Sequence, residues 1–461
     1  MSLDAFRKQI GDIRHSDEPS LIRRMSRDMT GGFSPILKAE GKGKLAELVV
    51  IPESREEVIA VAAAAARHRI AVLPRGAGTC NWGQGIPLAG GIVMDMRRLT
   101  RILSMDAGRV RAEPGILLGD LDRQTKEAVG AELRIHPSSR SIATLGGFIA
   151  GGHVGMGSCT WGILHDRGNI AGLEMVSVTE EPEIVELRGE DVNFVHHSYG
   201  TTGIITAVEM PLAPAFAWRE AVVDFEDFAQ ATRFGITLGQ SDGILLKMVS
   251  INAWPYPSYF DGLVRHLREG RHTVHVMVAD NGYEAFADLA MRMDGTVVYS
   301  GLEGQGDFGK PLYEYSFAHA RWHANKHDPR TVANIGIFPH DDLVGSVVRV
   351  YEKFRDLGPL RLDMKRINGQ LTVQGAPIFP YRDADHLASV VKGLEDEGVR
   401  SANTHSMHVK ENGMKAISAG EAAFRRRMDP YGLCNPGKVE ALPGSDTILP
   451  TSGWHTDTAA A

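Results

Sequence analysis

Two clusters of glycine in the first third of the chain constrain its fold more than any other feature of the sequence. The first begins at Pro74-Arg75-Gly76-Ala77-Gly78-Thr79 and continues to Gly91, between apolar runs at 70–73 and 92–94 that are typical of short buried strands. The second is Thr144-Leu145-Gly146-Gly147-Phe148-Ile149-Ala150-Gly151-Gly152. A loop with so few Cβ atoms lets several backbone N–H groups approach one anion. The first cluster is therefore suited to a pyrophosphate, and the alternative is an ordinary turn between two strands.

The segments between and after these clusters predict an α+β fold. A helical stretch at 55–69 precedes the first cluster, as in alternating α/β structure. Strand-like runs at 101–105, 109–112, 172–178, 183–187 and 203–210 predict a second, more antiparallel lobe. Beyond a boundary at Pro211 and Pro214, strands at 243–250, 272–279, 360–366 and 370–375 alternate with helices at 226–238, 282–293, 342–356 and 384–397. These later elements predict an α+β cap, after which the chain returns to the first domain.

Length, charge and cysteine content argue against several classes of protein. The 461 residues are enough for two domains with a large core, and the net charge of −7 argues against a nucleic-acid partner, which would call for a basic face. Three scattered cysteines, Cys80, Cys159 and Cys434, argue against a disulfide framework and are typical of a reducing compartment. The longest apolar run, at 58–66, is too short to span a bilayer, and the N-terminus lacks the apolar core of a signal peptide. We therefore expect a soluble, cytoplasmic protein.

Three further motifs accompany the glycine clusters along the chain. They are Arg111-Ala112-Glu113-Pro114-Gly115, Tyr199-Gly200-Thr201-Thr202-Gly203-Ile204-Ile205-Thr206 and Asp429-Pro430-Tyr431-Gly432-Leu433-Cys434-Asn435-Pro436-Gly437-Lys438. In this order and at these separations, the set resembles the FAD-binding flavoproteins of the vanillyl-alcohol oxidase / p-cresol methylhydroxylase (PCMH-type) family. The likeness is greatest to the branch that includes the glycolate oxidase FAD subunit. It covers residues 40–215 and the last part of the chain before residue 440.

The resemblance implies a two-lobed PCMH-type FAD-binding domain with an inserted α+β substrate cap domain. The implied boundaries are an N-terminal helical segment at 1–40, the FAD-binding domain at 41–215, the cap at 216–400, a C-terminal return at 401–442 and a disordered tail at 443–461. Covalent members of the family place a histidine in the first loop, where this chain has Thr79-Cys80. We therefore expect non-covalent FAD, with His153 and Cys159 as the alternative attachment points.

The resemblance also implies which residues contact FAD. Arg75, Gly76, Ala77, Gly78 and Thr79 would surround the pyrophosphate and Asn81 would close the loop, although Arg75 could instead pair with a carboxylate. The second cluster would follow the ribityl chain and the ring through Thr144, Gly146, Gly147, Ile149 and Ala150, unless it forms a tight strand bend. Other residues expected at the same cleft are Ser138, Ser141, Gly157, Ser158 and Trp161, with Ile205 at the adenine and Asn435 at the C-terminal turn.

A row of histidines in the expected cap supplies the main candidate catalytic groups. Tyr315, His319, His323 and His327 are four residues apart, a spacing that puts them on one stripe of a helix. One interpretation is a cap helix that faces the flavin, with His319 as a general base and Arg321 or Lys326 holding an anion. The alternatives are a zinc site and a polar outer face without function.

Other candidates lie later in the cap. In Asn403-Thr404-His405-Ser406-Met407-His408, His405 is a second candidate base, and Lys365 and Arg366 are candidate anion-binding residues. The branch's metal-dependent hydroxy-acid dehydrogenases carry a His-x-Gly-Asp-Gly-Asn-x-His signature, which this chain lacks. We therefore predict no metal, and this departure leaves the 2-hydroxy-acid substrate in doubt. The stretch Gly304-Gln305-Gly306-Asp307-Phe308-Gly309 matches a dinucleotide fingerprint, but Asp307 would lie beside the phosphates, so we interpret it as a mobile surface loop.

These observations together predict an FAD-dependent oxidoreductase, either an oxidase or a dehydrogenase. It would take a hydride from a C–H next to oxygen or nitrogen of a small organic substrate onto flavin N5, and O2 or a partner electron carrier would reoxidise the flavin. The alternatives are a flavin-binding electron-transfer subunit without its own substrate site, an NADPH-dependent enol reductase, and a flavin-free scaffold. The sequence leaves the oligomeric state open.

Overall fold

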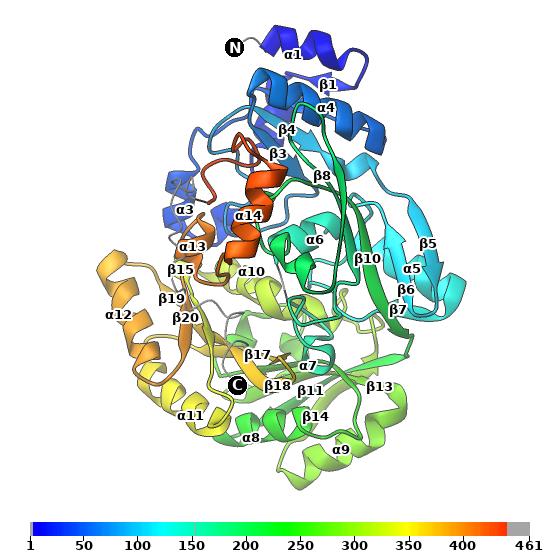
Figure 1. Ribbon diagram of the computed structural model, residues 1–461. Coiled ribbons are helices and arrows are strands. Elements are labelled where there is room, and N and C mark those ends of the chain that lie inside the picture. The colour runs from blue at the N-terminus through cyan, green and yellow to red at the C-terminus, as the bar shows by residue number, and fades with distance from the viewer. Residues whose placement is uncertain (1–2, 153, 440–461) are drawn as a thin grey trace.

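Three main sheets follow one another from one end of the molecule to the other (Figure 1). The computed structural model describes residues 3–152 and 154–439. His153 and the tail at 443–461, about which the sequence made predictions, therefore lie outside the described residues. Helices α1 and α4 cover one end of the molecule, and α8, α9 and α11 cover the other (Figure 1).

A small sheet with a parallel core forms the first lobe, and the first glycine cluster starts at its edge. In the order β1–β2–β4–β3, strand β4 pairs in parallel with both β2 and β3. Helix α4 connects β2 to β3 and buries alanine side chains, which allow it to pack closely on the strands. Because β3 ends at Arg75, the glycine loop starts at the carboxyl edge of the sheet, where α/β proteins bind ligands. The elements are α1 (Leu3–Ile10), β1 (His15–Ser16), α2 (Pro19–Met25), α3 (Pro35–Glu40), β2 (Leu48–Val50), α4 (Arg55–His68), β3 (Val72–Arg75) and β4 (Ile92–Asp95).

An antiparallel sheet forms the second lobe. Its strand order is β5–β6–β10–β8–β9, and β7 also pairs with β10. Helices α5 and α6 pack on its inner face, where Leu121, Leu145 and Phe148 are buried. Pro211 and Pro214, which we expected to mark a boundary, lie within the second half of β10. The elements are β5 (Ile102–Asp106), β6 (Arg109–Ala112), α5 (Leu118–Val129), β7 (Ala131–Leu133), α6 (Leu145–Gly151), β8 (Gly172–Val176), β9 (Ile184–Arg188) and β10 (Ile204–Pro214).

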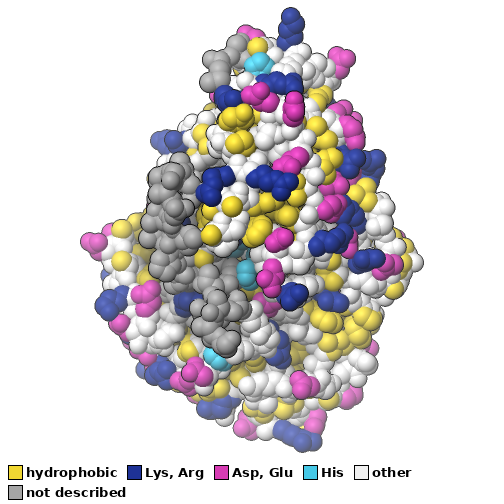
Figure 2. All heavy atoms as spheres, viewed as in Figure 1, with side chains coloured by type: hydrophobic (Ala, Val, Ile, Leu, Met, Phe, Trp, Pro, Cys, Tyr) yellow, Lys and Arg dark blue, Asp and Glu magenta, His cyan; other side chains and the backbone are white. Residues whose placement is uncertain are grey.

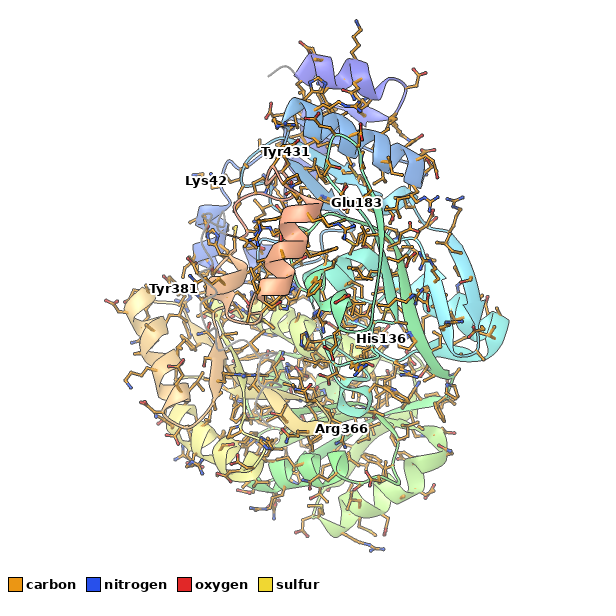
Figure 3. The ribbon with its side chains drawn as sticks, viewed as in Figure 1. Lys42, His136, Glu183, Arg366, Tyr381 and Tyr431 are labelled. Carbon is orange, nitrogen blue, oxygen red and sulfur yellow. The ribbon has the colours of Figure 1, made fainter. Side chains whose placement is uncertain are left out.

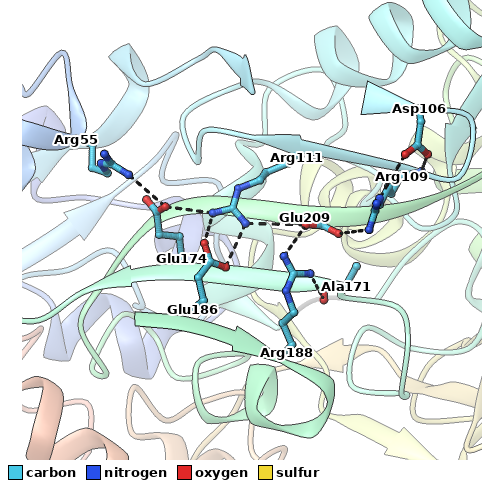
Figure 4. Close-up of polar contacts among 9 residues, drawn as sticks. All are labelled: Arg55, Asp106, Arg109, Arg111, Ala171, Glu174, Glu186, Arg188 and Glu209. Carbon is cyan, nitrogen blue, oxygen red and sulfur yellow. Dashed lines mark hydrogen bonds and ion pairs between the residues drawn. The ribbon is translucent and has the colours of Figure 1, made fainter. Parts of the chain in front are cut away.

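The opposite face of this sheet carries arginines and acidic residues that pair across the strands (Figure 4). Arg111 on β6 lies 3.1 Å from Glu174 and 3.9 Å from Glu209, and it also pairs with Glu186. Arg188 on β9 lies 2.9 Å from Glu209. Successive residues of a strand point to opposite faces, so alternation of apolar and charged residues gives one buried and one charged face. The pairs across β6, β10, β8 and β9 favour the observed register.

An eight-stranded antiparallel sheet forms the cap region, residues 218–402. Its order is β14–β11–β13–β12–β17–β18–β16–β20. Helices α8, α9, α11 and α12 cover one face of the sheet, whereas α7 and α10 lie on the side of the two lobes (Figure 1). The strands are β11 (Trp218–Phe225), β12 (Leu246–Asn252), β13 (His272–Ala279), β14 (Thr296–Leu302), β16 (Ile335–Ile337), β17 (Leu360–Ile367), β18 (Gln370–Pro377) and β20 (Arg400–Ala402). The helices are α8 (Phe228–Gly239), α9 (Tyr283–Arg292), α10 (Phe317–His327), α11 (Leu343–Phe354) and α12 (Ala384–Glu395), and a small sheet joins β15 (Thr331–Val332) to β19 (Phe379–Pro380). Helix α7 (Ser158–Trp161) comes from the part of the chain that forms the second lobe and packs on β12 and β17.

The chain then returns to the first lobe. Helices α13 (Val409–Asn412) and α14 (Ala419–Met428) lead to a segment beside β3. There the N–H of Val72 donates to Leu433 O at 2.7 Å, and the N–H of Asn435 donates to Val72 O at 2.8 Å. The last described residues therefore extend the sheet next to the strand that leads into the glycine loop.

The second glycine cluster differs from what the sequence suggested. It forms helix α6, so the alternative of a tight strand bend is wrong. Two of its glycines allow close packing against other parts of the protein. A Cβ on Gly146 would lie 2.5 Å from the Pro114 Cβ, and a Cβ on Gly152, where φ is +68°, would lie 2.1 Å from the His197 ring. The fingerprint-like stretch at 304–309 is the loop after β14, and there Asp307 lies 3.2 Å from Arg265.

Buried ion pairs join the second lobe to the cap region. Lys247 on β12 is only 2 % exposed and lies 3.1 Å from Glu132 on β7. Glu132 also accepts a hydrogen bond of 2.8 Å from the Trp218 indole. Arg140 lies 2.9 Å from Glu303 across the same boundary. Because a buried charge is stable only with a partner, these pairs fix how the cap sits on the second lobe.

Replacing Lys247 with methionine is expected to destabilise the protein. Lys247→Met removes the buried cation and leaves Glu132 without one of its partners, which should lower the free energy of unfolding by about 3 kcal/mol. Lys392→Met is the matched control, because Lys392 pairs with Asp396 on the surface and its side chain is 74 % exposed. Urea unfolding of the two variants checks this. Equal midpoints for both would contradict a role for the buried pair.

Candidate functional site

A cavity lies where the first glycine loop, helix α6 and the cap region meet. Its wall contains most of the residues expected at the FAD pyrophosphate and ribityl chain, and two of the candidate catalytic residues. The predicted residues that line it are Arg75, Gly76, Ala77, Gly78, Thr79, Asn81, Ser138, Thr144, Gly147, Ala150, His319 and Arg321. The fold therefore brings residues about 240 positions apart into one site.

The glycine loop presents free hydrogen-bond donors to this cavity. Among the hydrogen bonds of the described residues, none starts from a backbone N–H of residues 76–81. Residues larger than glycine would not fit at two positions of this loop. A Cβ on Gly76 would lie 2.0 Å from Thr144 Oγ1, and Gly78 has a φ of +69°, which other residues rarely adopt. Thr144 Oγ1 is itself buried and finds no partner within the described chain. Buried donors of this kind call for an acceptor supplied by a ligand.

Arg75 adds a positive charge at the same end of the cavity. Its Nη2 donates to Arg27 O at 2.8 Å and its Nη1 to Gly76 O at 3.2 Å. It forms no ion pair with any carboxylate of the described residues, so the alternative that Arg75 pairs with a carboxylate is wrong. Burial lowers the pKa of Arg75, yet a guanidinium stays charged in proteins. The cation is therefore available to an anionic group in the cavity.

Asn435 and Lys438 hold the glycine loop from behind. Asn435 Nδ2 donates to Gln84 O at 3.0 Å and to Tyr199 O at 2.7 Å, and both acceptor residues line the cavity. Lys438 Nζ donates to Gly83 O at 2.6 Å. Asn435 was expected at the cofactor, but it does not line the cavity. Its position instead fixes two wall residues.

Several residues expected at the cofactor lie in the packing around the cavity. Gly146 and Ile149 face the buried core on α6, Ile205 lies in the core of the second lobe, and Ser141 is exposed. The segment that contains Gly157, Ser158 and Trp161 packs between the second lobe and the cap sheet. There the N–H of Gly157 donates to Lys247 O at 2.6 Å. A buried, small or glycine-rich position looks the same in sequence whether it packs on protein or on a ligand.

The histidine stripe reaches the cavity at a single position. Helix α10 starts at Phe317, so Tyr315 lies in the preceding 3₁₀ turn and donates to Phe308 O at 3.3 Å. His323 stacks on the Tyr315 ring with centroids 4.6 Å apart, and His327 lies 3.0 Å from Asp261. Each four-residue step along a helix turns the side chain by about 40°. Of the four residues, only His319 lines the cavity, so the prediction of one stripe facing the site is wrong.

His319 and Arg321 supply a base and a cation at the cap end of the cavity. His319 Nδ1 is buried without a partner among the described residues, and burial lowers the pKa of this imidazole. Arg321 donates to Phe33 O, to Ala333 O at 3.4 Å and to Thr331 O at 3.3 Å. It forms no ion pair with a carboxylate in the described chain. Burial lowers the pKa of Arg321 to about 10, so it stays charged at neutral pH.

His405 lies next to this end of the cavity without lining it. Its Nδ1 is 2.8 Å from Ser34 Oγ, and its Nε2 is buried without a partner among the described residues. Burial, and then the nearby Arg321, lower the pKa of His405 to about 3. This histidine is neutral and enclosed, so a direct role as the base is not supported by its position.

Sequence reasoning did not find the cap-sheet part of the wall. The wall also contains Arg361 and Asp363 from β17, Gln374 from β18, and Tyr256 and Asn334 from other parts of the cap region. Arg361 pairs with Asp363, with Nη1 2.8 Å from Oδ2, so these two charges neutralise each other. A signal was present in β17, where Leu360-Arg361-Leu362-Asp363-Met364-Lys365 alternates apolar and charged residues and thus predicts one polar face.

Lys365 and Arg366 were the anion-binding candidates in β17. Lys365 is buried, its pKa is lowered to about 7 by burial and by Arg400, and its Nζ donates to Gln374 Oε1. Arg366 does not line the cavity: its Nε donates to Cys159 O at 3.0 Å and its Nη2 to Gly239 O at 3.0 Å. Figure 3 shows Arg366 on the cap side, below the level of His136. Arg366 therefore ties the α7 segment to the cap sheet.

Comparison with known proteins shows an FAD binding domain and FAD-linked relatives. A family profile described as an FAD binding domain matches residues 46–187. Glycolate oxidase subunit GlcD of Bacillus subtilis is 29 % identical over 441 residues, which cover 87 % of this chain and 91 % of the relative. The chain contains this FAD binding domain and is similar to PCMH-type FAD-linked oxidoreductases over most of its length. This flavoprotein is an FAD-dependent oxidoreductase, and its α+β fold with an inserted cap is confirmed.

Two other relatives and a solved structure extend the comparison. D-2-hydroxyglutarate dehydrogenase of Arabidopsis thaliana is 21 % identical, covering 93 % of this flavoprotein and 80 % of the relative. D-lactate dehydrogenase of Anaerostipes hadrus is 32 % identical over 181 residues, 37 % of each chain. A structure of alkyldihydroxyacetonephosphate synthase superimposes with a TM-score of 0.68 at 16 % identity, covering 95 % of this chain and 86 % of that one. This last likeness shows the shared fold.

The residues of the glycine loop suit FAD. Free backbone N–H groups at 76–81 and the unpaired Arg75 match the two negative charges of a pyrophosphate without a metal ion. Among residues 3–152 and 154–439, no group of three or more His, Cys, Asp or Glu side chains could hold a metal. Within those residues no helix combines the length and the apolar character needed to cross a membrane. On the face in Figure 2, Lys and Arg side chains are interspersed with Asp and Glu.

Filling the glycine loop with a methyl group is expected to displace the flavin. Gly76→Ala would place a Cβ 2.0 Å from Thr144 Oγ1 and push apart the two segments that meet at the cofactor. The control is Gly243→Ala, where a Cβ would meet nothing within 4 Å. The measurement is flavin released into the supernatant by acid precipitation, per mole of folded protein. We expect near-stoichiometric flavin for Gly243→Ala and little for Gly76→Ala; equal flavin content would contradict this placement of the pyrophosphate.

Proposed function

We propose that this flavoprotein oxidises a small 2-hydroxy acid by moving a hydride from the hydroxyl-bearing carbon to flavin N5. The observation that carries the proposal is Arg321, a buried cation that lines the cavity without a carboxylate partner among the described residues. A buried unpaired charge is unfavourable, so a substrate carboxylate would supply the missing partner. The names of three relatives, which contain glycolate, D-lactate and D-2-hydroxyglutarate, support the same substrate class.

The cofactor would lie with its pyrophosphate against the glycine loop. In this arrangement the N–H groups of Gly76 to Thr79 and of Asn81 donate to the phosphates, and Arg75 balances their charge. Thr144, Gly147 and Ala150 would follow the ribityl chain toward the cap. We infer non-covalent attachment, since Cys159 does not line the cavity and burial raises the pKa of the Cys80 thiol, which keeps it protonated. When bound, FAD accepts the hydride and passes electrons to O2 or a carrier.

His319 would accept the proton of the substrate hydroxyl. Burial is the main reason why its pKa lies below the usual value of 6.5, so the imidazole is neutral at pH 7 and can act as a base. His319 and Arg321 both line the cavity, so the proposal places a substrate held by Arg321 within reach of His319.

The cap sheet would orient the remaining substrate oxygens. The Gln374 amide oxygen accepts from Lys365, which leaves the amide N–H groups of Gln374 for a substrate oxygen. Asn334 lines the same wall, and its Oδ1 is buried without a partner among the described residues. Tyr256 and the neutralised Arg361–Asp363 pair complete this side. A base, a cation and several polar groups in one chamber argue against an electron-transfer subunit without its own substrate site.

A substrate panel tests the proposed function. Under anaerobic conditions, 2-hydroxy acids are expected to bleach the flavin absorption near 450 nm, whereas the corresponding alcohols and amines without a carboxylate and NADPH are not. Arg321→Met should lower kcat/KM for the acids roughly 30-fold, because a hydrogen bond to a charged group contributes about 2 kcal/mol. Arg321→Lys keeps a charge and should lose less.

The outcomes of this panel separate the candidates. Bleaching by alcohols as fast as by acids, or an Arg321→Met enzyme as active on the acids as the wild type, would refute the carboxylate anchor. Bleaching by NADPH alone would favour the enol reductase. Full flavin content with no bleaching by any compound would favour the electron-transfer subunit. Comparing O2 with an artificial electron acceptor then distinguishes an oxidase from a dehydrogenase.

The pH profile of kcat/KM tests His319 as the base. The neutral imidazole is the active form, so activity is lost as pH falls through its pKa, and burial places that loss below pH 6.5. His319→Gln should lower kcat about 100-fold or more and abolish the acidic limb. His327→Gln, on the exposed part of the same helix, is the control and should keep the wild-type profile. An unchanged acidic limb in His319→Gln would assign the base to another group.

A further inference from the structure

A short N-terminal segment borders the cavity and touches both of its ends. This segment, residues 27–34, contains a 3₁₀ turn at Met29–Gly32 and is called the strap below. Met29 and Phe33 line the cavity. The strap packs on the glycine loop on one side and on helix α10 on the other, so it spans the two parts of the site to which different roles are assigned.

The strap is tied to the glycine loop by hydrogen bonds in both directions. The N–H of Met29 donates to Cys80 O at 2.9 Å. Thr30 Oγ1 accepts from the N–H of Gly83 at 2.5 Å, and the Asp28 carboxylate accepts from the N–H of Gly85 at 3.2 Å. A movement of the loop is therefore transmitted to the strap.

The other end of the strap holds helix α10. Gly32 O accepts from Asn325 Nδ2, and Phe33 packs edge-to-face on Trp322 with centroids 4.9 Å apart. The contact is tight, because a Cβ on Gly32 would lie 2.2 Å from the Trp322 ring. The orientation of helix α10 at the cavity therefore depends on where the strap lies.

Two of the buried arginines that line the cavity, Arg75 and Arg321, donate to carbonyl groups of the strap. Arg75 Nη2 donates to Arg27 O at 2.8 Å, and Arg321 Nη2 donates to Phe33 O. Carbonyl oxygens satisfy guanidinium donors and orient them without neutralising the charge. The same segment thus positions the cation near the glycine loop and the cation at the cap end while leaving both free for anions.

We propose that the strap couples cofactor binding to the substrate anchor. An anion seated in the glycine loop fixes the loop and, through Asp28, Met29 and Thr30, the strap; the strap then fixes Arg321 through Phe33. The proposal rests on the proposed function to the extent that Arg321 is the carboxylate anchor. Coupling of this kind is reciprocal, so a carboxylate bound at Arg321 must tighten the flavin by the same factor as the flavin tightens the carboxylate.

The test uses two neighbouring glycines of the strap. Gly32→Ala forces the strap away from Trp322, whereas a Cβ on Gly31 would meet nothing within 4 Å, so Gly31→Ala is a matched control. The rate of flavin release from each holoenzyme is followed by fluorescence after dilution, with and without oxalate, a carboxylate that cannot donate a hydride. We expect oxalate to slow release about 10-fold in the wild type and in Gly31→Ala, and to have no effect in Gly32→Ala.

Hydrogen exchange of the same holoenzymes gives a readout that needs no substrate. Gly32→Ala should speed exchange both in the glycine loop, 76–85, and in helix α10, while Gly31→Ala should change neither. Asp28→Ala, which acts from the loop side without a steric clash, should have the same two effects if Gly32→Ala does not fold. Faster exchange confined to helix α10 in Gly32→Ala would overturn the coupling.

The two measurements separate this proposal from the proposed function. In one outcome, Gly32→Ala speeds exchange in both the glycine loop and helix α10, but oxalate has no effect on the wild type. That outcome would keep the strap as a coupling element and refute Arg321 as a carboxylate anchor. If oxalate perturbs the wild-type flavin spectrum but leaves its release rate unchanged, the anchor stands and the coupling is refuted.

Discussion

The structure depends on holding backbone N–H groups without protein acceptors, and buried positive charges without a protein carboxylate, at one cavity. The N–H groups of residues 76–81 and the guanidinium groups of Arg75 and Arg321 all face one cavity. Left alone, such groups would favour water or a collapsed loop. The surroundings prevent collapse, because Asn435 and Lys438 hold the loop from behind. In the proposed arrangement FAD would supply the acceptors, and the free energy of its binding would then also stabilise the fold.

The two faces of the cap sheet differ in chemical character. One face packs on four helices and is apolar, whereas the other presents Arg361, Asp363 and Gln374 to the cavity. Arg361 pairs with Asp363, so their charges offset each other, and Arg321 is the charge to which the proposed function assigns the substrate anion. Buried ion pairs such as Lys247–Glu132 then fix the cap against the second lobe, and with it the position of this polar face relative to the glycine loop.

Periodicity predicted the regular elements well because each is a local consequence of its own residues. The strand predicted at 272–279 has those bounds, and the helix predicted at 384–397 is Ala384–Glu395. Prediction failed where the spacing of residues in the sequence was used to infer the direction in which their side chains point. Tyr315 precedes the first residue of helix α10, and His323 turns away to stack on it. The glycines of α6 and Gly157 indicated close approach, but only the fold shows whether protein or ligand is the neighbour.

The sequence alone determined that the chain forms a glycine loop after a buried strand, that a second lobe and a cap follow, and that the ordered motifs belong to an FAD-binding flavoprotein. These conclusions rest on backbone freedom and apolar spacing, which are local properties. Only the tertiary structure decided which side chains share the cavity. Arg321 and Arg75 are almost 250 residues apart, and both are oriented by the strap at 27–34. Contacts of such long range arise from packing among distant segments, which no local pattern of residues encodes.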